Sequence, residues 1–116
     1  MSKVLVTGAT GGHGSIGSRV VALLTSAGIA VRAMARSNDA RAETLRRTGA
    51  EVVLGDFMNL STLRSALLGV ERVLFCYPLA DGLLQATANL CVAARDAGVR
   101  SVVNISIMIA AEAHPN

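Results

Sequence analysis

A glycine-rich segment between a short apolar run and a helical pattern constrains the fold of this chain more than any other feature. The segment extends from Val4 to Leu24 and reads VLVTGATGGHGSIGSRVVALL. The apolar run before the glycines is typical of a buried strand, and the residues after them recur at the spacing of a helix. A strand, a glycine-rich turn and a helix in this order predict a phosphate-binding turn, in which backbone N–H groups face an anion.

The rest of the chain alternates between short β-rich runs and helical patterns. The predicted strands are Lys3–Thr7, Ile29–Ala35, Glu51–Leu54, Arg72–Cys76 and Ser101–Ser106. The predicted helices are Ile16–Ala27, Asp39–Thr48 with Asn38 as its cap, a helix from a cap at Asn59 through Leu68, and Asp81–Ala97. This alternation predicts an α/β fold with a doubly wound, Rossmann-like parallel sheet of about five strands in the order 3-2-1-4-5. The ligand crevice is expected between the first and fourth strands, at their carboxyl ends.

Length and composition predict one domain over residues 1–116. The chain is 52% hydrophobic and 16% charged, which excludes disorder driven by low hydrophobicity and high charge. No apolar run approaches the ~20 residues of a membrane span, and the N-terminus has no signal-peptide layout. We therefore expect a soluble, cytoplasmic protein that does not act at a membrane.

Charge and cysteine spacing exclude two further classes. The net charge of +3 fits an anionic ligand, but ten scattered arginines, one lysine and 3% aromatic residues do not predict nucleic-acid binding. Cys76 and Cys91 lack metal-ligand spacing, so no metal site is predicted and both are expected to be buried free thiols. Because Tyr77 and Lys3 are the only residues of their types, a catalytic Tyr–Lys pair on one helix is excluded within this chain.

Two glycine spacings fit the turn. Gly8, Gly11 and Gly14 form one, and Gly8, Gly11 and Gly17 form the other. The second is favoured because Gly17 lies eleven residues before Gly28, which is expected to end the helix in a left-handed conformation.

In the favoured spacing, Ile16 and Val20 fall on one helical face and the turn gains three residues. The longer turn brings His13 near the phosphates, where exposure is favoured over a catalytic role. Thr10 and Ile16 complete the predicted cofactor contacts of this segment.

Arg36 and Ser37 follow the second strand, where an NAD-specific fold usually has a carboxylate that binds the ribose. An arginine can pair with a 2′-phosphate and stack on adenine, so NADP is favoured over NAD. Asp39 is better interpreted as a residue of the first helical turn than as a ribose ligand. The alternative for Arg36 is a solvated surface side chain.

Five short motifs together indicate a family. They are TGATG after the first strand, VRAMAR, GD, a proline after the fourth strand, and NIS at the fifth. With these motifs, residues Lys3–Ala111 resemble the N-terminal half of NmrA-like, atypical short-chain dehydrogenase/reductases. The resemblance implies an NAD(P)-binding Rossmann domain that lacks the C-terminal substrate-binding part. This chain departs from the family in its longer glycine turn.

The resemblance assigns further cofactor contacts. Asp56 lies where related proteins contact the adenine edge, and Phe57 is a candidate to cover the ring; the alternative for Asp56 is a turn former. Tyr77 and Pro78 fall beside the nicotinamide, where the proline suits a loop lying against a cofactor. Tyr77 is a candidate to bind a substrate carbonyl, although a half-buried aromatic residue is the favoured interpretation.

Ser106 occupies the position of the family's strand-end serine, whose hydroxyl can orient a substrate carbonyl. The alternative is that it satisfies a backbone group at the strand end. Ile107 follows it in place of a small polar residue, which is a second departure from the family.

The function favoured by these features is an oxidoreductase that transfers hydride from NADPH to a quinone or small carbonyl substrate. Whether the chain is an enzyme stays open, because a non-catalytic dinucleotide-binding sensor and a truncated remnant are alternatives. A methyltransferase is disfavoured, since Arg36 replaces the acidic residue expected for a ribose. The fifth strand is expected to leave an open sheet edge, which predicts a homodimer.

Overall fold

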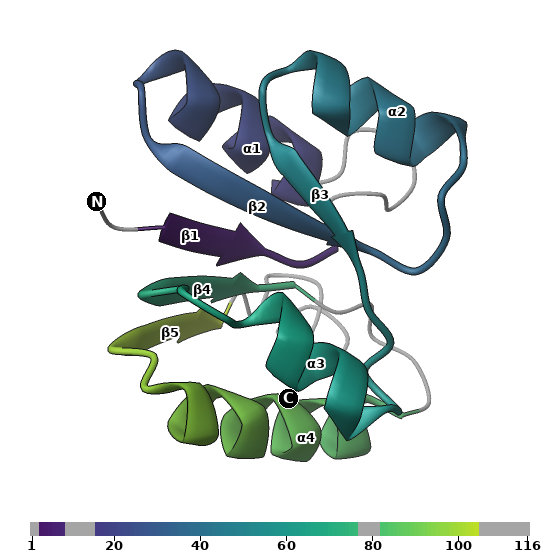
Figure 1. Cartoon of the computed structure of the whole chain (residues 1–116), viewed down its shortest axis with the longest axis vertical. Helices are drawn as coiled ribbons and strands as arrows, with labels where there is room; N and C mark the ends of the chain where they lie inside the picture. Colours follow the sequence, from purple (N-terminus) through teal and green to yellow (C-terminus); the bar gives the residue numbers. More distant parts are fainter. Residues whose placement is uncertain (1–2, 9–15, 77–81, 105–116) are drawn as a thin grey trace, which may run out of the picture.

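Each of the five predicted apolar runs forms a strand of a single parallel sheet in the computed structural model, which describes residues 3–8, 16–76 and 82–104 (Figure 1). The strands are β1 (Lys3–Val6), β2 (Ala30–Ala35), β3 (Glu51–Leu54), β4 (Arg72–Phe75) and β5 (Ser101–Asn104). Their order is β3-β2-β1-β4-β5, which confirms the predicted doubly wound α/β fold.

Within the described residues, four helices cover the two faces of the sheet. They are α1 (Ile16–Ser26), α2 (Ala40–Arg47), α3 (Leu60–Ala66) and α4 (Leu83–Ala97). In Figure 1, α1 and α2 lie above the sheet and α3 and α4 lie below it. β2 and β3 lie on one side of β1, and β4 and β5 lie on its other side. Because the crossover between two parallel strands is right-handed, this change of side places the helices after β3 on the opposite face of the sheet.

The sheet divides the core into two clusters. Consecutive residues of β1 point to opposite faces, so Leu5 joins Phe75 and Leu90 on the α3–α4 side, while Val6 joins Val21 on the α1–α2 side. Leu5 and Val6 are both fully buried. This double coverage explains why the central strands are continuous apolar runs rather than alternating ones.

Several helix boundaries differ from the sequence prediction: α1, α2 and α3 end one or two residues earlier than predicted, and α2 and α4 begin later. Asp39, not Asn38, caps α2: its backbone is extended and its carboxylate accepts hydrogen bonds from the N–H groups of Arg41 and Ala42. Asp39 is therefore not a first-turn residue. Gly82 has a φ of 92° and caps α4, so this helix begins at Leu83 rather than Asp81. A left-handed residue cannot continue a right-handed helix.

The prediction that both cysteines are buried was wrong. Cys76 is half-buried after β4 and Cys91 is exposed on α4, although both are free thiols. Cys91 lies beside the buried Leu90, but one residue further along a helix rotates the side chain by about 100° toward solvent.

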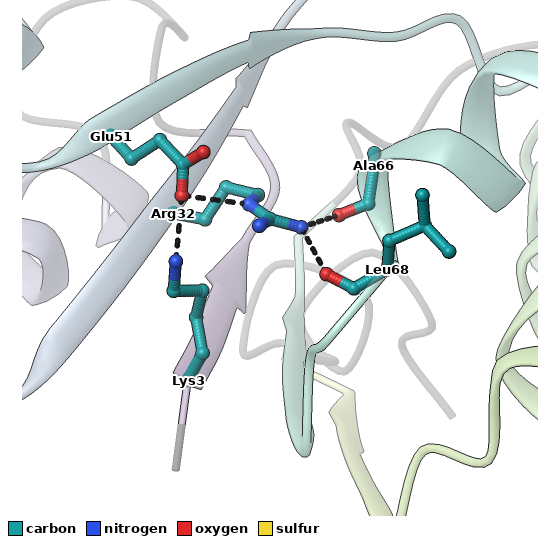
Figure 2. A network of polar contacts seen from close by, with 5 residues as sticks. All are labelled: Lys3, Arg32, Glu51, Ala66 and Leu68. Atoms are coloured by element: carbon teal, nitrogen blue, oxygen red, sulfur yellow. Dashed lines mark hydrogen bonds and ion pairs between the residues drawn. The ribbon is translucent and has the colours of Figure 1, made fainter. Parts of the chain in front are cut away.

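A polar network joins the amino-terminal side of the sheet to the end of α3 (Figure 2). Oε1 of Glu51 accepts from Nζ of Lys3 at 2.9 Å and from Nε of Arg32 at 3.0 Å. Nη1 of Arg32 donates to the carbonyls of Ala66 and Leu68, each at 2.7 Å. The nearly buried guanidinium therefore satisfies carbonyls that the end of α3 leaves without helical partners.

Within the described part of the chain, no helix is both long enough and apolar enough to cross a lipid bilayer.

Candidate functional site

The carboxyl ends of β1 and β4 meet where the strand order reverses, and Thr7 joins them. The Thr7 hydroxyl donates to the carbonyl of Cys76 at 3.0 Å and accepts from its N–H at 2.9 Å. The Thr7 N–H donates to the carbonyl of Leu74 at 3.1 Å. This is the position at which doubly wound sheets bind ligands.

The next residue, Gly8, has a left-handed backbone conformation that only glycine adopts readily at this position. Its φ is 73°, and a Cβ built on it would lie 2.8 Å from both Cβ and O of Cys76. The chain therefore leaves β1 through a close approach to β4 that any side chain would obstruct. This observation fits the predicted role of the first glycine in a phosphate-binding turn.

The far end of the predicted turn is the start of α1. Gly17 is buried there, as expected for a glycine that lets a helix approach a strand, whereas Ile16 is largely exposed. The predicted contacts Thr10, Gly11 and Gly14 lie outside the described residues, so the choice between the two glycine spacings stays a prediction.

Arg36 and Ser37 lie exposed just after β2. Arg36 makes no ion pair with any residue in the described ranges. The Ser37 hydroxyl donates to Oδ2 of Asp39 at 3.1 Å, and Nη2 of Arg41 pairs with the same oxygen at 3.1 Å. The hydrogen bond from Arg41, followed by that from Ala42, holds the pKa of Asp39 below its usual value.

Asp39 is therefore an ionised helix cap whose two carboxylate oxygens already accept hydrogen bonds. It has less capacity to accept from a ribose hydroxyl, whereas Arg36 presents an exposed guanidinium at the same strand end. This arrangement fits a phosphorylated ribose better than an unmodified one.

Asp56 follows β3 in a tightly bonded turn. Its Oδ1 accepts from the N–H of Met58 at 2.9 Å. The hydroxyl of Thr62 accepts from the Asp56 N–H at 2.9 Å and donates to its carbonyl at 3.1 Å. Asp56 is thus a turn former, and its predicted contact with adenine stays a prediction.

The ring of Phe57 lies in the core. It is 9% exposed and packs edge-to-face on Phe75, with centroids 5.4 Å apart. In this structure its ring is therefore directed toward β4 rather than toward solvent, and a contact with adenine stays a prediction.

Tyr77, Pro78 and Ser106, the candidates for the nicotinamide end, lie outside the described residues. Cys76, which precedes Tyr77 in the sequence, is half-buried, and this burial raises the pKa of its thiol. The site holds that thiol in its neutral form at neutral pH.

Two residues whose side chains bond the backbone beside these strand ends were not singled out from the sequence. Thr7 is a fully buried polar residue at the end of an apolar run, and Asn89 is an amide within the apolar pattern of α4. Nδ2 of Asn89 donates to the carbonyl of Phe57 at 2.7 Å. A polar residue at a position where the pattern expects an apolar one was the signal available in both cases.

The described residues fit a dinucleotide cofactor. Gly8 supplies the close backbone approach, Arg36 and Ser37 end the second strand, and Asp56 ends the third. All lie at the carboxyl edge of one parallel sheet, the edge at which doubly wound folds bind dinucleotides.

Comparison with known proteins agrees with this geometry. A family model described as NAD(P)H-binding matches residues 11–116. An NAD(P)H azoreductase from Xenophilus azovorans is 40% identical over 93 residues, covering 80% of this chain and 32% of the azoreductase.

Two solved structures are similar in fold and sequence. Citrobacter sp. triphenylmethane reductase has a TM-score of 0.75 and 37% identity, over 90% of this chain and 36% of that protein. An NADPH-dependent quinone oxidoreductase from Escherichia coli, solved with NADPH, has a TM-score of 0.77 and 31% identity, over 87% of this chain and 35% of that protein. The chain spans about a third of the length of the curated relatives it matches.

Proposed function

Because the chain belongs to the NAD(P)H-binding family, we propose that it forms the cofactor-binding part of an NADPH-dependent reductase. The reaction is transfer of hydride to a quinone or small carbonyl substrate. Both a quinone oxidoreductase and an azoreductase are among the similar proteins, which supports this class. Within it, the motifs quoted above favour the NmrA-like branch.

The observation that carries the proposal is the close approach at Gly8. A φ of 73° and the absence of space for a Cβ beside Cys76 let the backbone turn directly into the segment that precedes α1. Such a turn gives a diphosphate access to backbone N–H groups and to the positive end of a helix. We propose that Gly8, Gly11, Gly14 or Gly17, Thr10 and Ile16 line the diphosphate.

We propose NADP rather than NAD as the cofactor. Arg36 and Ser37 would hold the 2′-phosphate, since Asp39 caps α2 and is hydrogen-bonded on both oxygens. Asp56 would accept from the exocyclic amine of adenine through a carboxylate oxygen not used by Met58, with Phe57 supporting that turn.

At the nicotinamide end, Tyr77 and Pro78 are proposed cofactor contacts, and Tyr77 and Ser106 are proposed to bind the substrate oxygen. When bound, the cofactor supplies the hydride. The protein orients the substrate by hydrogen bonds from these hydroxyls. No Tyr–Lys pair is needed if the acceptor is a quinone, which fits the single lysine of this chain.

We further propose a homodimer in the cytoplasm. β5 is the outer strand of the described sheet and all four of its residues are exposed, including Val102 at 42% and Val103 at 57%, which supports pairing of two copies along this strand. Free thiols at Cys76 and Cys91 suit a reducing compartment. Sedimentation at high concentration should give twice the monomer mass, and a monomer throughout would overturn the dimer.

The experiment that tests the function has two steps. NADPH and NADH are titrated while nucleotide fluorescence is followed, and tighter binding of NADPH is expected. Quinones and small carbonyl compounds are then added and the loss of absorbance of the reduced cofactor is measured. Binding without oxidation would favour a dinucleotide sensor, and no binding of either nucleotide would overturn the proposal.

A further inference from the structure

The amide of Asn89 connects α4 to the turn after β3. Asn89 is half-buried, its Nδ2 donates to the carbonyl of Phe57 at 2.7 Å, and its Oδ1 accepts from Nε2 of Gln85 at 2.9 Å. Both ends of the amide are therefore bonded, which fixes its orientation on the helix.

The helix itself does not require this residue. Asparagine is a weaker helix former than alanine or leucine, and the flanking buried positions Ala86, Leu90 and Ala93 are apolar. A half-buried amide here is explained by what it contacts, which is the backbone of another element 32 residues away in sequence.

One planar peptide group links Asn89 to Asp56. The carbonyl of Phe57, which Asn89 binds, and the N–H of Met58 belong to the same peptide unit. That N–H donates to Oδ1 of Asp56 at 2.9 Å. The C=O and N–H bonds of this unit lie in one plane and point in opposite directions, so fixing the carbonyl also fixes the N–H group that binds the Asp56 carboxylate.

The ring of Phe57 does not fix this plane by itself. It anchors the side chain against Phe75, but the peptide that follows Phe57 can still rotate about its ψ angle. Thr62 bonds the N–H and the carbonyl of Asp56, and the N–H of Asn59 donates to the same carbonyl at 2.9 Å, which closes the turn around the peptide between Phe57 and Met58. The bond from Asn89 adds a contact from α4 to the carbonyl of that peptide.

We propose that Asn89 is a positioning residue for the cofactor: through the peptide between Phe57 and Met58 it orients the Asp56 carboxylate toward the adenine amine. This inference rests on the proposed function, because it assumes that Asp56 faces adenine. It assigns no contact between Asn89 and the cofactor.

The test compares two halves of the cofactor. Calorimetry measures binding of 2′,5′-ADP and of reduced nicotinamide mononucleotide to the wild type, to Asn89→Leu and to Thr87→Val. Thr87 is the matched control, since its hydroxyl donates within α4, to the carbonyl of Leu83. Asn89→Leu should bind 2′,5′-ADP about fivefold more weakly, as expected for one lost hydrogen bond, and nicotinamide mononucleotide unchanged.

A double-mutant cycle shows whether the effect passes through Asp56. Asn89→Leu should weaken 2′,5′-ADP binding in the wild type but have no further effect in the Asp56→Ala variant. Hydrogen exchange at the Met58 amide should be faster in Asn89→Leu and unchanged in Thr87→Val.

Three outcomes separate the two proposals. Failure of the wild type to bind 2′,5′-ADP would overturn the proposed function, and this inference with it. Binding by the wild type with equal affinity in Asn89→Leu would overturn the inference alone. Equal weakening of both cofactor halves would also overturn it, because that result indicates a general loss of structure.

Discussion

The side-chain hydroxyl of Thr7, at the end of β1, bonds both the N–H and the carbonyl of Cys76, at the end of β4. The two residues are 69 positions apart in sequence, and the donor and acceptor distances are 3.0 and 2.9 Å. The side chain of Thr7 is fully buried. A single hydroxyl thus fixes the spacing of the two strand ends between which a dinucleotide is expected to lie.

Replacing Thr7 by valine should destabilise the protein by about 1–3 kcal/mol, because it leaves the N–H and carbonyl of Cys76 without that partner while keeping the shape of the side chain. Urea denaturation of the wild type, Thr7→Val and Thr7→Ser measures the effect. Serine keeps the hydroxyl and should retain most of the stability. A loss of stability in Thr7→Ser but not in Thr7→Val would show that the methyl group, not the hydroxyl, matters.

Replacing Gly8 by alanine should cost more than replacing Gly28 by alanine. Both glycines have a left-handed backbone, with φ of 73° and 81°, so both substitutions introduce a strain of about 1 kcal/mol. A Cβ at Gly8 also lies 2.8 Å from Cys76, whereas nothing lies within 4 Å at Gly28. The difference between the losses of unfolding free energy in Gly8→Ala and Gly28→Ala measures the cost of the contact with Cys76. Equal losses in the two variants would contradict a contribution from that contact.

Replacing Arg36 by glutamate should weaken NADPH binding by about 10- to 100-fold, the equivalent of losing one or two charge-assisted hydrogen bonds, and should affect NADH far less. Fluorescence titration of both nucleotides measures the ratio of the dissociation constants for NADPH and NADH. Arg47→Glu makes the same charge change at an exposed position at the other end of α2 and serves as control. An unchanged ratio in Arg36→Glu would remove its proposed role.

Acid should weaken the network of Figure 2 through Glu51. Hydrogen bonds from Lys3 and then Arg32 lower the pKa of Glu51 from its ordinary value of 4.5. The pKa of the folded state lies below that of the unfolded state, so this contribution to stability is present above about pH 4.5 and is lost as the pH falls through the folded value. Because the side chain is 47% exposed, the effect should be below about 1 kcal/mol.

The measurement is the free energy of unfolding of the wild type and of Glu51→Gln between about pH 7 and about pH 3. The advantage of the wild type should shrink as the pH falls. If the free energies of unfolding of the two proteins differ by the same amount at every pH, the ionised Glu51 carboxylate is not the source of the pH-dependent stability.

Much of the fold followed from local patterns. The apolar runs predicted all five strands, and the cap at Asn59 was confirmed by its hydrogen bonds to the N–H groups of Ser61 and Thr62. Such signals involve residues within one turn of one another, so their geometry is set without the rest of the molecule. Even there, two adjacent cap candidates were confused, since Asn38 and Asp39 have the same capping chemistry and only the backbone angles distinguish them.

The candidate site was predicted less completely. Placing Gly8, Arg36 and Asp56 just after the first three strands required only the positions of those strands in the sequence. The direction of the Phe57 ring toward Phe75 and the contact of Asn89 with the Phe57 carbonyl required knowledge of which elements pack together. An apolar ring after a strand is compatible with both the core and a ligand, and only the position of β4 decides between them.

The sequence by itself determined the alternation of strands and helices, the glycine that follows β1 and the residues at the strand ends, because periodicity and turn chemistry are local properties of a chain. Only the tertiary structure decided that Thr7 bonds Cys76, that Arg32 binds the end of α3, and that Asn89 reaches the turn after β3. These contacts join residues 32 to 69 positions apart, and their formation depends on the crossovers that bring distant strand and helix ends together.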